Sequence, residues 1–134
     1  MSARSKARKR ALDVLYASEM RSWSPEEALA QQAEAGPVND YTLTLVRGVT
    51  EHAARLDEVI TTYAEGWSLK RMPAVDRNVL RLAIFEVLYV DDVPAAVAVS
   101  EALNLVRDLS TDESPSFVNG VLGNIVRDRD QLVP

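Results

Sequence analysis

The sequence has no cysteine and only one histidine, His52. The absence of cysteine excludes disulfides, thiolate catalysis and cysteine-based zinc or iron–sulfur sites. One histidine without a nucleophile or a cluster of ligands provides no catalytic centre, so we expect a structural role for it. The sequence also lacks a glycine-rich phosphate loop and an H-E-x-x-H motif, and acidic pairs such as Asp112-Glu113 offer too few ligands for a metal site. These absences predict a binding protein rather than an enzyme, without catalytic residues, metal or cofactor.

Long apolar segments are missing as well. No uninterrupted apolar run approaches the roughly 20 residues that a membrane span requires. The basic N-terminus is followed by an amphipathic helical pattern and not by the apolar core and cleavage site of a signal peptide. These features predict a soluble, cytoplasmic protein with no membrane partner.

Charge is distributed unevenly along the chain. The formal net charge is −5, but residues 1–10 contain five basic and no acidic side chains, so the remaining residues hold 20 acidic and 10 basic ones. A basic segment favours phosphate, while an acidic body repels non-specific nucleic acid. The pattern predicts a nucleic-acid contact in a basic arm of residues 1–10, and a merely solvated tail is the alternative.

Apolar residues recur at helical spacing, and only the short stretch 95–99 alternates like a strand. Ser24-Pro25 and Ser114-Pro115 are typical helix starts, whereas Gly36-Pro37 and Gly66 end helices. The charged tail from residue 127 is expected to fray. With a short turn at 69–72, the pattern predicts six or seven helices in one all-α domain of 134 residues. The main helices are expected at residues 3–22, 25–34, 40–65, 73–91, 94–109 and 115–126.

The helix that begins at Pro73 is the most apolar, and it should be buried on most sides. From residue 79 to 90 it includes only two charged residues, Arg81 and Glu86. A buried charge without a partner costs several kcal/mol. Each of the two is therefore either paired inside the fold or directed at a surface that binds protein or RNA.

Three further residues carry packing expectations. Gly120 and Gly123 lie within the last helix, where each costs about 1 kcal/mol relative to alanine. This cost suggests that the helix packs tightly against a neighbour there. Trp67, directly after Gly66, is expected to fill the corner between two helices.

Three segments occur in the order ARSKARKRALDVLY, PAVDRNVLRLAIFEVLY and DVPAAVAVSEALNLVRDLSTDESPSFVNGVLGNI. They resemble the NusB family of transcription antitermination factors, and the resemblance covers nearly the whole chain. In its sequence motifs and its length, the chain is similar to family members from high-GC Gram-positive bacteria. The resemblance implies an all-α, NusB-like bundle in two subdomains, which agrees with the helical pattern.

The resemblance also implies RNA binding without catalysis. Members of the family recognise the single-stranded boxA element of nascent RNA together with NusE, a small-subunit ribosomal protein. The complex helps the RNA polymerase elongation complex pass terminators, mainly in ribosomal RNA operons. Some members self-associate, so the choice between monomer and homodimer stays open.

The family's functional positions map onto individual residues of this sequence. Glu113 and Phe117 resemble residues that border the RNA surface, although the position of Phe117 fits core packing equally well. Tyr16 and Glu86 match positions on the side that faces NusE, and Arg81 is a weaker candidate for the same surface. The arginine-rich motif, which implies RNA contacts, falls at Arg4, Lys6, Arg8, Lys9 and Arg10.

Two alternatives of other classes stay open. NusB-like domains also occur in RNA cytosine methyltransferases, where a catalytic Rossmann domain follows the helical one, and no such domain follows within these 134 residues. A purely protein-binding helical adaptor would use the basic segment only as a tail. Preference for boxA RNA over scrambled RNA would distinguish an RNA-binding factor from an adaptor.

Overall fold

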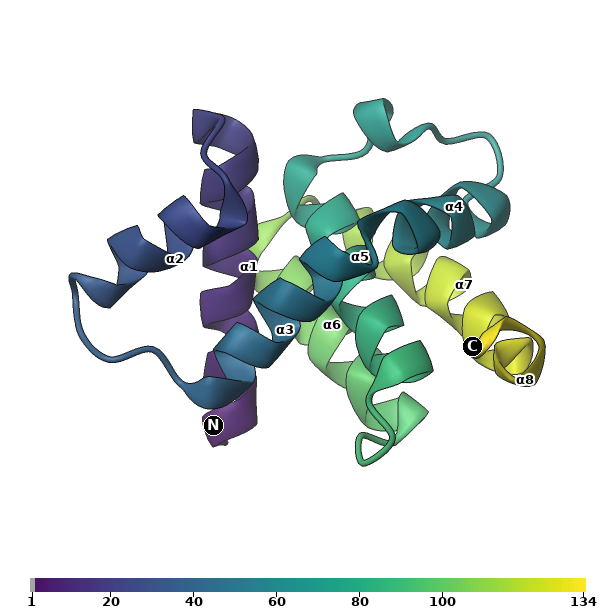
Figure 1. Cartoon of the computed structure of the whole chain (residues 1–134). Coiled ribbons are helices and arrows are strands. Elements are labelled where there is room, and N and C mark those ends of the chain that lie inside the picture. Colours follow the sequence, from purple (N-terminus) through teal and green to yellow (C-terminus); the bar gives the residue numbers. More distant parts are fainter. Residues whose placement is uncertain (1) are drawn as a thin grey trace. The chain divides into compact units, whose positions relative to one another are not determined.

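The computed structural model of the chain describes residues 2–134, and in this range it contains only helices (Figure 1). This confirms the all-α class. Residues 2–134 form eight α-helices and one 3₁₀ helix, η1, which spans Leu69–Arg71. The α-helices are α1 (Ala3–Arg21), α2 (Pro25–Ala33), α3 (Asp40–Glu51), α4 (Ala53–Tyr63), α5 (Ala74–Tyr89), α6 (Ala95–Leu109), α7 (Ser114–Arg127) and α8 (Arg129–Leu132).

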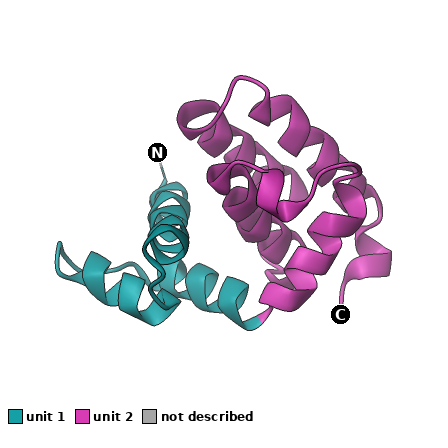
Figure 2. Cartoon of the chain, turned by 90° about the horizontal axis from the view of Figure 1, so that it is seen from above, with its two compact units in different colours: residues 1–51 teal, residues 52–134 magenta. Residues whose placement is uncertain are grey.

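The chain forms two compact units, residues 1–51 and 52–134 (Figure 2). In unit 1, α1 packs against both α2 and α3. The hydroxyl of Thr42 on α3 donates a hydrogen bond to the carbonyl of Ala7 on α1 at 3.2 Å. At the start of α2, Ser24 and Glu27 form the reciprocal capping box that the sequence predicts.

Unit 2 is organised around α5, which contacts α4, α6, α7 and α8. Eleven of its 16 residues are buried, as expected for a helix covered on most sides. The helix begins at Ala74, one residue after the predicted start, because Pro73 lies at its N-cap. In α7, the apolar residues that recur at helical spacing are buried: Val118, Val121, Leu122 and Ile125.

The prediction of one helix over residues 40–65 is wrong, because the structure contains two helices there, α3 and α4, which are divided at His52. His52 has φ −103° and ψ 17°, outside the helical range. Its ring stacks on Tyr89 at a centroid distance of 4.0 Å and lies 6.1 Å from Phe85. The apolar stripe is continuous in sequence but serves two cores: α3 packs on α1, and α4 packs on α5 and α7. His52 therefore has a structural role within unit 2, where its ring packs on α5.

Two other packing expectations are wrong. A Cβ built on Gly120 or Gly123 would meet nothing within 4 Å, so neither glycine marks a tight helix contact. Trp67 does not fill a corner, because 51% of its surface is exposed.

The open space around Gly120 and Gly123 predicts that alanine stabilises the fold. We expect Gly120→Ala and Gly123→Ala each to raise the free energy of unfolding by about 1 kcal/mol, because alanine restricts the unfolded chain and favours the helix. Urea denaturation followed by circular dichroism measures the change. Gly66→Ala is the matched control and should destabilise the protein, because Gly66 has φ +79°. A loss of stability in the two helix variants would show that a neighbour does approach α7 there.

Candidate nucleic-acid interface

The basic residues of the N-terminus form the first turns of α1 rather than a free arm. Ser2 caps this helix, its hydroxyl accepting a hydrogen bond from the backbone N–H of Ser5 at 3.0 Å. The first turn contains no acidic residue. Cations at a helix N-terminus oppose the helix dipole, so an anion bound beside this segment relieves the unfavourable field. The local electrostatics therefore suit phosphate.

The five basic side chains do not share one environment. Arg8 is only 4% exposed, and its guanidinium lies 5.8 Å from the ring centre of Tyr41 on α3. Arg10 donates to the side chain of Gln32 at 3.0 Å and to its carbonyl at 3.3 Å. These two arginines therefore help to hold α1 against α3 and α2 within unit 1.

The other three basic residues are accessible to a ligand. Lys6 is exposed and has no partner among residues 2–134. Arg4 is exposed, with its guanidinium 4.2 Å from the ring centre of Tyr41. Lys9 is half-exposed and pairs with Asp13 at 2.8 Å. The accessible part of the predicted motif is therefore Arg4, Lys6 and Lys9.

In unit 2, the structure brings the two other predicted RNA residues together where α7 begins. Glu113 is the N-cap residue of α7 and is exposed, and Phe117 is half-buried in its first turns. Both line a hollow of about 800 Å³. The ring of Phe117 lies 5.8 Å from that of Trp67, at an interplanar angle of 59°. Sequence reasoning missed this aromatic contact, because residues 67 and 117 are far apart in the chain.

A buried polar network fixes the turn before α7. The carboxylate of Asp76 on α5 accepts hydrogen bonds from the hydroxyls of Ser110 at 2.6 Å and Ser114 at 2.8 Å. The backbone N–H of Thr111 donates to the Ser114 hydroxyl at 3.2 Å. Asp76 and Ser114 are almost completely buried. The position of Glu113 is therefore set by bonds on both sides of the turn.

The three predicted partner residues differ in exposure. Tyr16 on α1 is 41% exposed. Arg81 makes a bidentate pair with Asp57 on α4, at 2.8 and 3.2 Å, and donates to Asn78 at 3.0 Å. Glu86 is only 2% exposed. Both charges of the apolar run on α5 are thus held inside the fold, and Tyr16 is the exposed residue of this set.

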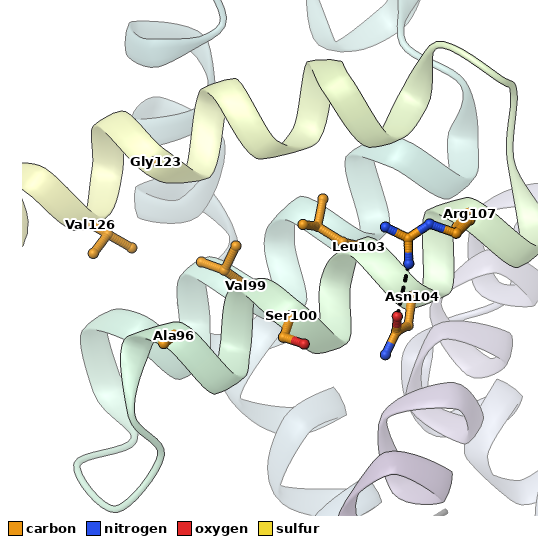
Figure 3. A pocket seen from close by; sticks show the side chains of 8 residues that line it. All are labelled: Ala96, Val99, Ser100, Leu103, Asn104, Arg107, Gly123 and Val126. Atoms are coloured by element: carbon orange, nitrogen blue, oxygen red, sulfur yellow. Dashed lines mark hydrogen bonds between the residues drawn. The ribbon is translucent and has the colours of Figure 1, made fainter.

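A second hollow, of about 420 Å³, lies between α6 and α7 and contains none of the predicted site residues (Figure 3). Arg107 donates to Asn104 across one turn of α6 at 3.0 Å. The apolar side chains of Val99 and Leu103 line this hollow and are only partly buried. The lining residues are Ala96, Val99, Ser100, Leu103, Asn104, Arg107, Gly123 and Val126.

The C-terminal segment is anchored rather than frayed. The hydroxyl of Tyr63 donates to Asp128 at 2.7 Å, and Arg127 donates to the same carboxylate at 3.0 Å. Hydrogen bonds from Arg127 and Tyr63 lower the pKa of Asp128, and its carboxylate in turn raises the pKa of Tyr63. Helix α8 is also tied to α5, since the side chain of Arg129 donates a hydrogen bond to the carbonyl of Val87 at 2.9 Å.

The described residues include neither a cluster of metal-binding side chains nor a helix that could span a membrane. Between residues 2 and 134, no three histidine, aspartate or glutamate side chains are grouped so that they could hold a metal ion. In the same range, no helix is both long and apolar enough to cross a membrane.

Comparison with known proteins gives a consistent result. A model of the NusB family matches residues 5–127. The chain is 66% identical over 137 residues to the transcription antitermination protein NusB of Nocardioides sp., covering 98% of this chain and 99% of the relative. It is 53% identical over 135 residues to the protein of the same name from Arthrobacter sp., covering 99% of each. The matched relatives are mostly actinobacterial, which agrees with the expected origin.

Solved structures give the same match. NusB of T. maritima has a TM-score of 0.87 at 32% identity, covering 96% of this chain and 93% of that chain. A crystal structure of the antitermination factors NusB and NusE in complex with double-stranded RNA also matches. Its TM-score is 0.83 at 28% identity, with 92% of this chain and 96% of that chain covered.

The anchor at Asp128 predicts a pH dependence of stability. Because the pKa of Asp128 is lowered in the folded state, its stabilising effect is present above its unfolded pKa of about 3.9 and is lost as the pH falls through the folded value. We expect the difference in Tm between the wild type and Asp128→Asn to shrink between about pH 5 and pH 2. Asp130→Asn, at a fully exposed carboxylate, is the control and should leave the pH profile unchanged. A difference in Tm that stays constant with pH would contradict the anchor.

Proposed function

Because the chain belongs to the NusB family, we propose that it is an antitermination factor that binds single-stranded boxA RNA together with NusE. In this function it acts on the RNA polymerase elongation complex, mainly during transcription of ribosomal RNA operons. The relatives are named as transcription antitermination proteins, and a matched chain was solved with NusE and RNA. The observation that carries the proposal for this chain is the basic, acid-free first part of α1.

The RNA contacts divide into two kinds. In unit 1, Arg4, Lys6 and Lys9 supply positive charge to phosphates, while Arg8 and Arg10 hold the helix that presents them. In unit 2, the exposed carboxylate of Glu113 and the half-buried ring of Phe117 border the bound strand. Sequence-selective RNA recognition usually reads unstacked bases in single strands, and Phe117 offers one face for such a base.

The NusE contact in this proposal involves Tyr16 in unit 1 and α5 in unit 2. Tyr16 is exposed and amphipathic, as residues at protein interfaces often are. Arg81 and Glu86 are held inside unit 2, so we expect them to act by fixing the surface of α5 rather than by large direct contacts. A second copy of this chain is the alternative occupant of the same surfaces.

A fluorescence anisotropy titration tests the proposal. Labelled boxA RNA and a scrambled RNA of equal length are titrated with the chain, with and without NusE. We expect tighter binding to boxA when NusE is present. Sequence-blind binding that NusE does not change would contradict the proposal and favour the adaptor function.

Removal of two accessible lysines tests the electrostatic part. For single strands, log Kd changes with log salt by about 0.7 per phosphate contact, so about four contacts give a slope of magnitude near 3. We expect Lys6→Ala/Lys9→Ala to lower this magnitude by about 1.4 with little change in Tm. Arg47→Ala/Arg107→Ala removes the same charge from exposed positions elsewhere and should leave the slope unchanged. Equal slopes for the wild type and the lysine variant would exclude these lysines from the interface.

A substitution of Tyr16 tests the partner contact. Tyr16→Ala should weaken NusE binding by about tenfold, because exposed tyrosines often dominate interface energies, and it should leave the Tm nearly unchanged. Leu109→Ala, at a residue of similar exposure, is the control. Isothermal titration with NusE measures both affinities. Unchanged NusE affinity in Tyr16→Ala would exclude Tyr16 from the contact.

Glu86→Gln should instead lower the Tm of the free chain, because Glu86 is buried.

A further inference from the structure

Trp67 is the most exposed large apolar residue among those described, at 51% of its surface. It follows Gly66, whose φ of +79° turns the chain after α4, and its backbone N–H donates to the carbonyl of Ala64 at 3.1 Å. A single exposed apolar side chain is ordinary. What distinguishes Trp67 is the set of residues that surround it.

The indole of Trp67 and the ring of Phe117 form an aromatic pair that lines two hollows of unit 2. Trp67 and Phe117 both line the hollow of about 800 Å³ that is bordered by η1 and the start of α7. Both also line a hollow of about 590 Å³ between the end of α4 and the side of α7. The tilted contact between the rings leaves ring surface open towards each hollow. Gly120 lines the smaller hollow, with nothing near the position of a Cβ.

The positive charge beside this pair is available for binding. Lys70 and Arg71 on η1 are exposed, and they are the only basic side chains of unit 2 without a partner among residues 2–134. Arg71 lines the larger hollow. The backbone of η1 is held in place, because Arg77 donates to the carbonyls of Met72 at 2.7 Å and Leu69 at 3.4 Å. The other basic residues of unit 2 are engaged: Arg55, Arg77, Arg81, Arg107, Arg127 and Arg129.

Acidic groups define the opposite side of the larger hollow. Asp112 and Glu113 line it and are exposed, whereas Asp76 is occupied by the hydroxyls of Ser110 and Ser114. A phosphate is repelled from the carboxylate side and attracted to the η1 side. A strand bound here therefore runs its backbone along η1 and presents a base to the accessible surface of the ring pair.

We propose that Trp67 stacks on an unpaired RNA base together with Phe117, while Arg71 binds the adjacent phosphate. This inference rests on the proposed RNA-binding function and adds a base-stacking site on the connection between α4 and α5 (Figure 1). Aromatic platforms beside unpartnered cations are the usual means of holding single strands. Bases inside a duplex are already stacked, so the site selects single-stranded over double-stranded RNA.

The fluorescence of Trp67 reports stacking directly. The chain has two tryptophans, Trp23 and Trp67, so Trp23→Phe leaves Trp67 as the only one. We expect single-stranded boxA RNA, titrated in the presence of NusE with the NusE signal subtracted, to quench this fluorescence. The quenching should saturate at the Kd that anisotropy gives, and a duplex of the same sequence should quench much less.

Affinity measurements separate stacking from charge. Trp67→Ala should weaken RNA binding by about tenfold or more without changing the salt slope, and Trp67→Phe should restore part of the loss. Arg71→Ala should lower the magnitude of the slope by about 0.7. Val97→Ala and Arg107→Ala are matched controls at exposed positions of unit 2. Circular dichroism should show an unchanged fold, since Trp67 is half-exposed.

The outcomes distinguish this inference from the function on which it rests. If the wild type binds boxA RNA, but Trp67 is not quenched and Trp67→Ala binds as tightly, the stacking site is wrong and the RNA-binding function stands. If Trp67→Ala weakens NusE binding and not RNA binding, the surface is a protein contact and the inference is overturned. If the wild type shows no selective RNA binding, the proposed function fails and the stacking site fails with it.

Discussion

The buried carboxylate of Asp76 is the interaction on which the candidate RNA surface of unit 2 depends. A carboxylate removed from water is costly unless it is fully hydrogen-bonded, and here two serine hydroxyls meet that requirement. Both serines belong to the turn between α6 and α7, so the bonds tie this turn to the start of α5. These bonds also determine the positions of Glu113 and Phe117, because the two residues lie at the turn and just after it. The same helix carries Arg77 and Arg81, which fix η1 and α4.

Much of the fold follows from local sequence chemistry. The capping box of Ser24 and Glu27 and the dense apolar run of α5 determine their elements without help from distant residues. The break at His52 could not be predicted, because the apolar stripe on either side of it is continuous and only tertiary packing divides it between two cores. The prediction of tight packing at Gly120 and Gly123 was wrong for a related reason. A glycine within a helix signals either close packing or open space, and the sequence does not distinguish the two.

The candidate site was predictable by residue type but not by environment. Five basic residues among the first ten predict a phosphate-binding segment. The contact of Arg8 with Tyr41 and that of Arg10 with Gln32 join different helices, so the local sequence does not reveal them. The pairing of Trp67 with Phe117 joins positions 50 residues apart and has no local signal. Charge shows the same distinction. Several basic side chains have partners within the fold, whereas Lys6, Lys70 and Arg71 have none among residues 2–134, and the sequence alone does not separate the two groups.

Terminator readthrough in a reconstituted transcription reaction tests the central claim most directly. The template carries boxA upstream of a terminator, and RNA polymerase elongates in the presence of NusE, with or without this chain. The account predicts that the chain increases the readthrough fraction on the boxA template and not on a template with a scrambled element. An equal effect on both templates, or no effect on either, would contradict it.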